Sequence, residues 1–386
     1  KSDDRLVFPK NKDPRISIVL VFFNQAHLGL LCLESLLKKA DVDYELVIVD
    51  NASSKETILL LDRIDNAKLI KNNSNLGFVK AVNQGVAAAT GKFILLLNND
   101  AAIENGALSN SLQSINDNPD VGAVGAQIKL PDGTLQEAGS IIWKDGSCMG
   151  YGRGQSPDAP DFMFKREVDY CSGAFLLFRR EHFNDLGGFD LDYSPAYYEE
   201  SDFCIRLQKR GLKIIYNPKA KVTHYEFGSS EGFKEASLLQ KKNQQTLCRK
   251  HKEWLSGKYE PDLSNILNAR SANNFSNILF IDDRVPHPNL GSGYPRCAHL
   301  LNKLAQLDLN ITLYPLQFPI DDWNTSYQTL DNNIEIILGG GRVGLHTFLT
   351  ERKNFFEHII VSRVHNMEFF KNIITTDESL IKNTNI

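Results

Sequence analysis

Blocks of apolar residues alternate with amphipathic segments along the first hundred residues. The apolar blocks have the length of strands, and the segments between them have the spacing or the start signals of helices. The predicted strands are 16–23, 45–49, 67–70 and 93–97, and the predicted helices are 26–39, 53–64 and 77–89. Near-continuous apolar strands alternating with helices predict an α/β fold with a mostly parallel sheet and helices on both faces.

Two of these strands end in polar side chains. The strand 93–97 is followed by Asn98, Asn99 and Asp100, and the strand 45–49 is followed by Asp50. Ligands bind such sheets outside the carboxyl ends of the strands, so if the two strands are neighbours their polar tips face one crevice. Asn and Asp also end strands simply as turn formers, and either motif alone leaves that interpretation open.

The pattern changes after residue 101 and restarts near residue 277. A hairpin is predicted at 121–130 and 134–143, with a Gly/Pro-rich loop over 150–161 that can move over a site. Further predictions are strands at 168–178 and 213–216, helices at 197–210 and 231–254, and a linker at 255–274. Apolar strands reappear from 277 onward, about four in number. Two domains are therefore expected, 1–271 and 272–386.

Composition narrows the function classes. The chain is 42% hydrophobic and 23% charged, enough to bury a sizeable core, and its net charge of -4 argues against a nucleic-acid partner. Six scattered cysteines without a CxxC pair favour free thiols in a reducing compartment over a zinc site. No apolar run approaches the roughly 18 residues of a membrane span, and no signal-peptide core is visible. A cytoplasmic location is therefore expected.

Four motifs follow one another along the chain, and their order is informative. They are Asp50 after "ELVIV", "NSNLGFVKAVNQGV" at 73–86, "LLNND" at 96–100, and "YYEESDFCIRLQKRG" at 197–211 followed by "VTHYEFGSS". Together they resemble family 2 glycosyltransferases of the GT-A fold, particularly bacterial enzymes that build rhamnose-containing and other surface polysaccharides. The resemblance covers about residues 15–230.

That resemblance implies an inverting, metal-dependent transfer of a sugar from a nucleoside-diphosphate sugar, UDP- or dTDP-linked, to a hydroxyl of a growing surface glycan such as O-antigen or capsule. It leaves open whether the acceptor is lipid-linked and whether the protein associates with the inner face of the cytoplasmic membrane. The donor-binding residues it implies are Phe23, Asn24, Asp50, Asn75, Gly77, Asn83, Asn98, Asn99, Gly173 and Ala174.

The same resemblance implies the metal ligands and the base. The Asp-x-Asp motif that holds metal and diphosphate is Asn98-Asn99-Asp100 here, so Asp100 is the expected ligand of Mg²⁺ or Mn²⁺, with His224 as a second ligand. One carboxylate at a strand tip suffices, because substrate phosphates and water complete the shell of such ions.

In the family's acidic helix motif, the second carboxylate is the general base. That position is Glu200, beside Glu199, near a helix start whose dipole favours anions. Ordinary enrichment of acids in a first helical turn is the simpler interpretation and stays open. Asp202 and Arg206, four residues apart, predict a structural ion pair.

The second unit resembles the amino-terminal half of a GT-B glycosyltransferase, through "IDDRVPHPNLGSGYPR" at 281–296. A smaller, Rossmann-like and incomplete unit is therefore expected over 272–386.

Other function classes are weaker fits. A sugar nucleotidyltransferase needs a Gly-rich, basic loop after the first strand, where this chain has "FFNQAH". A dinucleotide oxidoreductase needs a GxGxxG that is missing there. A non-catalytic sugar-nucleotide-binding or scaffold domain stays open, because amides occupy 98 and 99 and Glu replaces Asp at 200.

Overall fold

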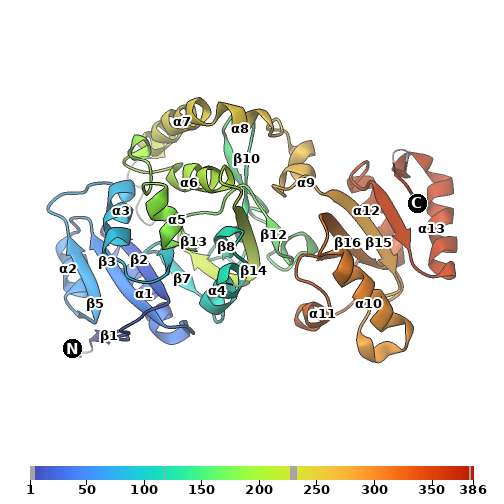
Figure 1. The fold of residues 1–386 in the computed structure, drawn as a ribbon, viewed down its shortest axis with the longest axis horizontal. Coiled ribbons are helices and arrows are strands. Elements are labelled where there is room, and N and C mark those ends of the chain that lie inside the picture. The colour runs from blue at the N-terminus through green and yellow to red at the C-terminus, as the bar shows by residue number, and fades with distance from the viewer. Residues whose placement is uncertain (1–4, 117, 227–232, 382–383) are drawn as a thin grey trace. The chain divides into compact units, whose positions relative to one another are not determined.

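The computed structural model describes residues 5–116, 118–226, 233–381 and 384–386 (Figure 1). The chain divides into two compact units, one formed by residues up to 157 together with 167–272, the other by 158–166 and 273–386. The short segment 158–166 thus groups with the second unit, although it precedes residue 271 in the sequence.

The first unit is built on a large sheet with strand order β14-β8-β13-β6-β2-β3-β5. Its amino-terminal elements follow the predicted alternation, and β2, β3, β5 and β6 are parallel. These elements are β2 (Ile16–Phe22), α1 (Ala26–Lys39), β3 (Tyr44–Asp50), α2 (Lys55–Leu61), β5 (Ala67–Lys71), α3 (Phe78–Ala88) and β6 (Phe93–Leu97). Because β2 lies between β3 and β6, the strands that precede Asp50 and Asn98 are not neighbours, but their carboxyl ends lie at the same edge.

Helices cover both faces of this sheet, as predicted. Side chains alternate between faces along a strand. Ile18 and Leu20 of β2 share a core with Leu33 of α1 and Leu112 of α4 (Ala107–Asn116). Val19 points the other way, toward α3, where a Cβ on Gly85 would come within 2.5 Å of its Cγ1. On that second face, the ring of Phe203 in α6 (Glu199–Gln208) packs 5.0 Å from that of Phe178.

The predicted strand 168–178 is wrong over most of its length. Only β13 (Phe175–Arg179) is a strand, and it runs antiparallel to both β6 and β8 (Val121–Lys129). The preceding residues form a turn in which the Phe175 N–H donates to the Ser172 carbonyl. The Ser172 N–H donates to a carboxylate, that of Glu137, and not to a neighbouring strand.

The predicted hairpin is confirmed only near its turn. β8 pairs with β9 (Leu135–Ala138), but the second arm breaks at Gly139, which has a φ of +72°. Beyond this glycine, β10 (Ser140–Ile142) pairs with β11 (Cys148–Gly150) in a separate small sheet. The acidic helix α6 begins at Glu199 and not at 197, because Tyr197 and Tyr198 both have positive φ.

The carboxyl-terminal part of the first unit differs from prediction in its boundaries. β14 (Lys213–His224) is three times the predicted length, and it pairs with the unpredicted β7 (Ala101–Ile103). The long predicted helix is α7 (Phe233–Lys250) and α8 (Lys252–Ser256), interrupted at His251, while positions 231–232 lie outside the described residues. The remaining elements are β1 (Leu6–Val7), β4 (Ile64–Asp65), β12 (Arg166–Glu167), α5 (Arg180–Asp185), η2 (Leu191–Tyr193), η3 (Leu263–Asn265) and α9 (Ile266–Ala269).

The second unit contains a parallel sheet in the order β17-β16-β15-β18. This order matches the first four strands of a doubly wound fold. Its strands are β15 (Ser276–Asp282), β16 (Leu309–Pro315), β17 (Glu335–Ile336) and β18 (His358–Val361). Its helices are η1 (Pro160–Phe162), η4 (Pro288–Leu290), α10 (Gly293–Leu304), α11 (Trp323–Thr329), α12 (Gly341–Glu351), α13 (Val364–Thr376) and η5 (Glu378–Ile381). Its likeness to half of a GT-B transferase stays a prediction.

Across the described part of the chain, no helix combines the length and the apolar character needed to cross a membrane.

Candidate active site

The turn after β2 and the end of β3 are joined by hydrogen bonds. Asp50 is 3% exposed, and its Oδ1 accepts from the Ser53 N–H at 3.0 Å. Asn24 has a left-handed backbone with φ of +61°, donates its N–H to Ser53 Oγ and accepts from the Ser54 N–H. Phe23, just before it, is 39% exposed. The structure therefore brings three of the predicted donor-binding residues to one edge of the sheet.

Asn51, which sequence reasoning missed, organises the next part of this edge. Its Nδ2 donates to Asn75 Oδ1 at 2.7 Å, and its Oδ1 accepts from Asn72 Nδ2 and from the Leu76 N–H. Asn75 Oδ1 in turn accepts from the Gly77 N–H. Gly77 has a φ of +83°, and a Cβ there would come within 2.6 Å of Pro195. The only available signal was the position of Asn51 directly after the strand-ending Asp50.

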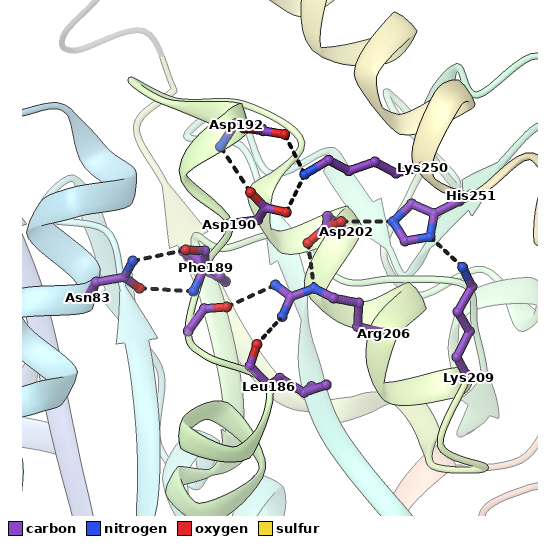
Figure 2. A network of polar contacts seen from close by, with 11 residues as sticks. Asn83, Leu186, Phe189, Asp190, Asp192, Asp202, Arg206, Lys209, Lys250 and His251 are labelled. Carbon is purple, nitrogen blue, oxygen red and sulfur yellow. Dashed lines mark hydrogen bonds and ion pairs between the residues drawn. The ribbon is translucent and has the colours of Figure 1, made fainter.

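Asn83, another predicted donor-binding residue, is engaged elsewhere. Its Nδ2 donates to the Phe189 carbonyl and its Oδ1 accepts from the Phe189 N–H, both at 2.9 Å (Figure 2). Both polar atoms of the amide are thus used to hold the loop before η2. A role for Asn83 in donor binding stays a prediction.

Asp100 and His224 lie in direct contact, at the pairing of β7 with β14. His224 Nε2 is 3.0 Å from Asp100 Oδ1 and 3.3 Å from Asn98 Nδ2, and its Nδ1 is 2.7 Å from Gln136 Oε1. The side-chain amide nitrogen of Asn99 is buried and has no hydrogen-bond partner among the described residues. The two predicted metal ligands are therefore adjacent, with an unused donor beside them in sequence.

Glu199 and Glu200 open helix α6 with buried carboxyl groups. One oxygen of each, Oε2, is buried without a hydrogen-bond partner in the described structure. Burial raises the pKa of Glu200 to about 7, opposed by hydrogen bonds from its own backbone, Ser201 and Gly173. Burial, and then the charge of Glu200, raises the pKa of Glu199 well above its ordinary value. Two unpartnered acidic oxygens with raised pKa values are typical of a reactive site and not of a solvated helix start.

A β-bulge links the two halves of the site. Ile128 of β8 is opposite Glu137, while its neighbour Lys129 is opposite Leu135, so Gln136 is the extra residue. Gln136 contacts His224, whereas Glu137 accepts from the Ser172 N–H at 3.0 Å and from Ser140 Oγ at 2.9 Å. Burial raises the pKa of Glu137. Sequence reasoning missed both residues; an acid in the apolar arm of a hairpin was the available signal.

Gly173 and Ala174, which were predicted to bind the donor, lie between these halves. Gly173 faces the side chain of Glu200, since a Cβ built on this glycine would lie 4.0 Å from the Glu200 Cβ, and the Ala174 carbonyl accepts from the Asn98 N–H at 3.2 Å. A chain of contacts therefore runs from Asp100 and His224 through this turn to Glu200.

The predicted ion pair of α6 is confirmed. Arg206 Nε lies 2.6 Å from Asp202 Oδ2 (Figure 2). The same guanidinium donates to the carbonyls of Leu186 and Gly188. Asp202 therefore belongs to the structural side of the helix, opposite in role to Glu199 and Glu200.

The residues present fit a divalent cation only with help from a substrate. No cluster of three His, Cys, Asp or Glu ligands occurs within the described ranges. Asp100 and His224 supply one carboxylate and one imidazole, and Mg²⁺ is commonly held by one or two carboxylates together with substrate phosphates. Gln136 on Nδ1 of His224 is the kind of partner that orients a ligating imidazole.

Comparisons with known proteins relate the chain to glycosyltransferases. Residues 17–187 match the family model described as glycosyl transferase family 2. The O-antigen biosynthesis protein RfbC of Myxococcus xanthus is 27% identical over 267 residues, which are 67% of this chain and 20% of that protein. The N-acetylglucosaminyl-diphospho-decaprenol L-rhamnosyltransferase of Mycobacterium tuberculosis is 28% identical over 249 residues, 58% of this chain and 80% of that protein. The chain thus spans only a fifth of the length of RfbC.

A solved structure supports the fold. GalNAc-T7, crystallised with UDP, GalNAc and Mn²⁺, superposes with a TM-score of 0.51 at 16% identity, covering 63% of this chain and 50% of that one. At this identity the likeness speaks for the fold alone, and it confirms the predicted GT-A-type α/β architecture.

Proposed function

We propose that this chain, whose residues 17–187 match the model of glycosyl transferase family 2, is an inverting, metal-dependent glycosyltransferase that acts in the synthesis of a surface glycan. The observation that carries the chemistry is the pair of buried, unpartnered carboxyl oxygens of Glu199 and Glu200. They belong to the same chain of contacts as Asp100 and His224. Inverting transfer from a sugar diphosphate requires a base beside the acceptor hydroxyl and a site that holds the diphosphate, and this chain of contacts has a candidate for each.

Glu200 is the proposed general base. Its carboxylate takes the proton from the acceptor hydroxyl while that oxygen forms a bond to the anomeric carbon. The bond from the anomeric carbon to the diphosphate oxygen breaks, and the nucleoside diphosphate leaves with the electron pair. Attack from the face opposite the leaving group inverts the anomeric centre.

Asp100 and His224 would hold a divalent cation with the diphosphate. When bound, such a cation takes up negative charge that develops on the leaving group. Asn99, with its buried and unpartnered amide nitrogen, would donate to a phosphate oxygen. Asp50, Asn24 and the Asn51-centred turn would hold the nucleoside.

The names of relatives suggest the biological setting. RfbC is named for O-antigen biosynthesis, and the mycobacterial relative is named for transfer of rhamnose to a decaprenol-linked acceptor. We therefore infer a surface-glycan acceptor, lipid-linked or free, and a UDP- or dTDP-linked donor. The cytoplasmic location, with or without peripheral contact to the membrane, stays a prediction.

A donor screen tests the proposal directly. The full chain is incubated with a panel of UDP-, dTDP- and GDP-sugars and candidate lipid-linked acceptors, and released nucleoside diphosphate is measured. We expect release from one donor to depend on the acceptor. Tight nucleotide binding without release from any donor and acceptor pair would instead support a non-catalytic scaffold. Asn98 and Asn99 favour that alternative, because amides stand where the family's motif begins with an acid.

The pH dependence of turnover follows from the pKa of Glu200. A general base acts when ionised, and burial raises the pKa of this carboxyl from 4.5 to about 7. We expect kcat/KM to rise about tenfold per pH unit below 7 and to level off above it. A profile that is already flat from pH 5.5 would contradict the assignment, because it would describe a carboxyl with an ordinary pKa.

A further inference from the structure

The backbone that presents the two glutamates adopts an unfavourable conformation. Tyr197 and Tyr198 have φ values of +75° and +72°, and Glu199 begins helix α6 immediately afterwards. Side chains with a Cβ rarely adopt positive φ, and two bulky residues in succession do so only when their surroundings hold them. Some contact outside the turn must therefore fix its shape.

That contact comes from helix α7, about fifty residues further along the chain. Asn243 is fully buried, and its Nδ2 donates to the carbonyls of Tyr193 at 3.1 Å, Ala196 at 2.9 Å and Tyr197 at 2.9 Å. The two N–H groups of this amide are thus shared among three carbonyls that converge on one point. The Oδ1 atom of the same amide is buried without a partner among the described residues. Three converging carbonyls need a donor, which fixes the orientation of the amide.

The body of helix α6 is held by other groups. Asp202 lies between His251 Nε2 at 2.8 Å and Arg206 Nε at 2.6 Å (Figure 2). Lys209 Nζ lies 2.8 Å from His251 Nδ1 and can only donate, so Nε2 carries the ring proton and donates to Asp202. Because these contacts do not involve Asn243, removing its amide would release the turn without releasing the helix.

We propose that Asn243 is a positioning residue for the glutamate pair: by holding three carbonyls of the 193–197 segment, it fixes the left-handed Tyr197–Tyr198 turn and thereby the direction of Glu199 and Glu200. The inference rests on the proposed transferase function for its catalytic consequence. Asn243 lies outside residues 17–187, which match the family model, so the proposal extends the site into helix α7.

The test compares Asn243→Ala with Leu247→Ala. Leu247 is also fully buried on α7, one turn further on, so the control removes buried atoms from the same helix without touching the three carbonyls. Both variants of the full chain are measured for melting temperature, kcat, nucleotide Kd and amide hydrogen exchange over residues 193–202. Asn243→Ser, which keeps one hydroxyl donor, is the second variant.

We expect Asn243→Ala to lower kcat by about 10- to 100-fold with nucleotide Kd within twofold, since misplacing a catalytic group affects the chemical step. Amides at 197–201 should exchange at least tenfold faster, and Asn243→Ser should fall between Asn243→Ala and wild type. Leu247→Ala should change neither quantity more than threefold at a similar loss of melting temperature. Equal loss of kcat and protection in both variants, or full kcat in Asn243→Ala, would overturn the inference. Hydrogen exchange can be measured without turnover, so the two proposals can fail separately. If the wild type transfers no sugar, the proposed function is rejected. A loss of protection confined to Asn243→Ala would still support the positioning role.

Discussion

Replacing Glu200 by glutamine is expected to lower turnover by roughly 10²- to 10⁴-fold, the usual contribution of a general base. Glutamine keeps the shape of the side chain, but it cannot take a proton at neutral pH. Nucleotide binding should change little, because the base contacts the acceptor hydroxyl. Steady-state kinetics with a nucleotide titration separates these two effects.

Glu199→Gln is the matched control from the adjacent position. Burial and the charge of Glu200 raise the pKa of Glu199 well above its ordinary value, so the site favours the neutral form of this carboxyl, which glutamine resembles. It should therefore lose less activity than Glu200→Gln. If Glu199→Gln is the inactive variant and Glu200→Gln is nearly wild type, the roles are reversed. If both keep full rate, the base lies elsewhere.

Glu200→Gln should also stabilise the fold at high pH. The folded-state pKa of Glu200 is raised, so the folded protein binds the proton more tightly than the unfolded chain does. Folding stability is therefore highest below pH 4.5 with respect to this group and is lost as pH rises through about 7. The full shift corresponds to on the order of 3 kcal/mol. Above pH 7 the neutral glutamine avoids this cost, and the variant should melt higher than wild type while turning over more slowly.

Replacing Asp100 by alanine is expected to abolish turnover, and a chelator should do the same to the wild type. Asp100 is the acid that ends the "LLNND" segment and the carboxylate in contact with His224. Without it, the candidate cation site keeps one side chain only, too few to hold the ion with the diphosphate. Activity is measured with and without Mg²⁺ or Mn²⁺ after chelation, and folding by thermal melting.

Asp62→Ala is the matched control for this loss of an acid. Asp62 forms an exposed pair with Lys71 at 3.0 Å, and such surface pairs contribute little to stability. It should leave both activity and its response to metal unchanged. Full turnover of the wild type in excess chelator would contradict the metal assignment, and an Asp100→Ala variant that fails to fold would be replaced by Asp100→Asn, which keeps the volume and loses the charge.

Patterns of apolar residues that are local in the sequence were enough to predict the first half of the fold. The strands at 16–22 and 93–97 were predictable because continuous apolar runs of that length suit strands buried on both faces. The predicted boundaries of strands were wrong where a backbone group forms a hydrogen bond to a side chain distant in the sequence. Residues 168–174 look like a strand in the sequence, but Glu137 holds the Ser172 amide, which removes it from any ladder.

The sequence by itself predicted which residues carry the candidate chemistry. Asp50 and Asp100 stand out because they directly follow apolar strand segments, which is a local feature. The resemblance to family 2 glycosyltransferases implied His224 and the Glu199–Glu200 pair, and helical spacing predicted the Asp202–Arg206 pair. Only the tertiary structure decided how they are held. Asn51 acts on the 72–77 turn, the bulge at Gln136 reaches His224, and Asn243 fixes the turn before Glu199. Each of these is a buried amide whose hydrogen bonds join segments about 20 to 90 residues apart, and no periodicity or spacing in a single chain encodes which distant carbonyl or amide such a side chain will meet.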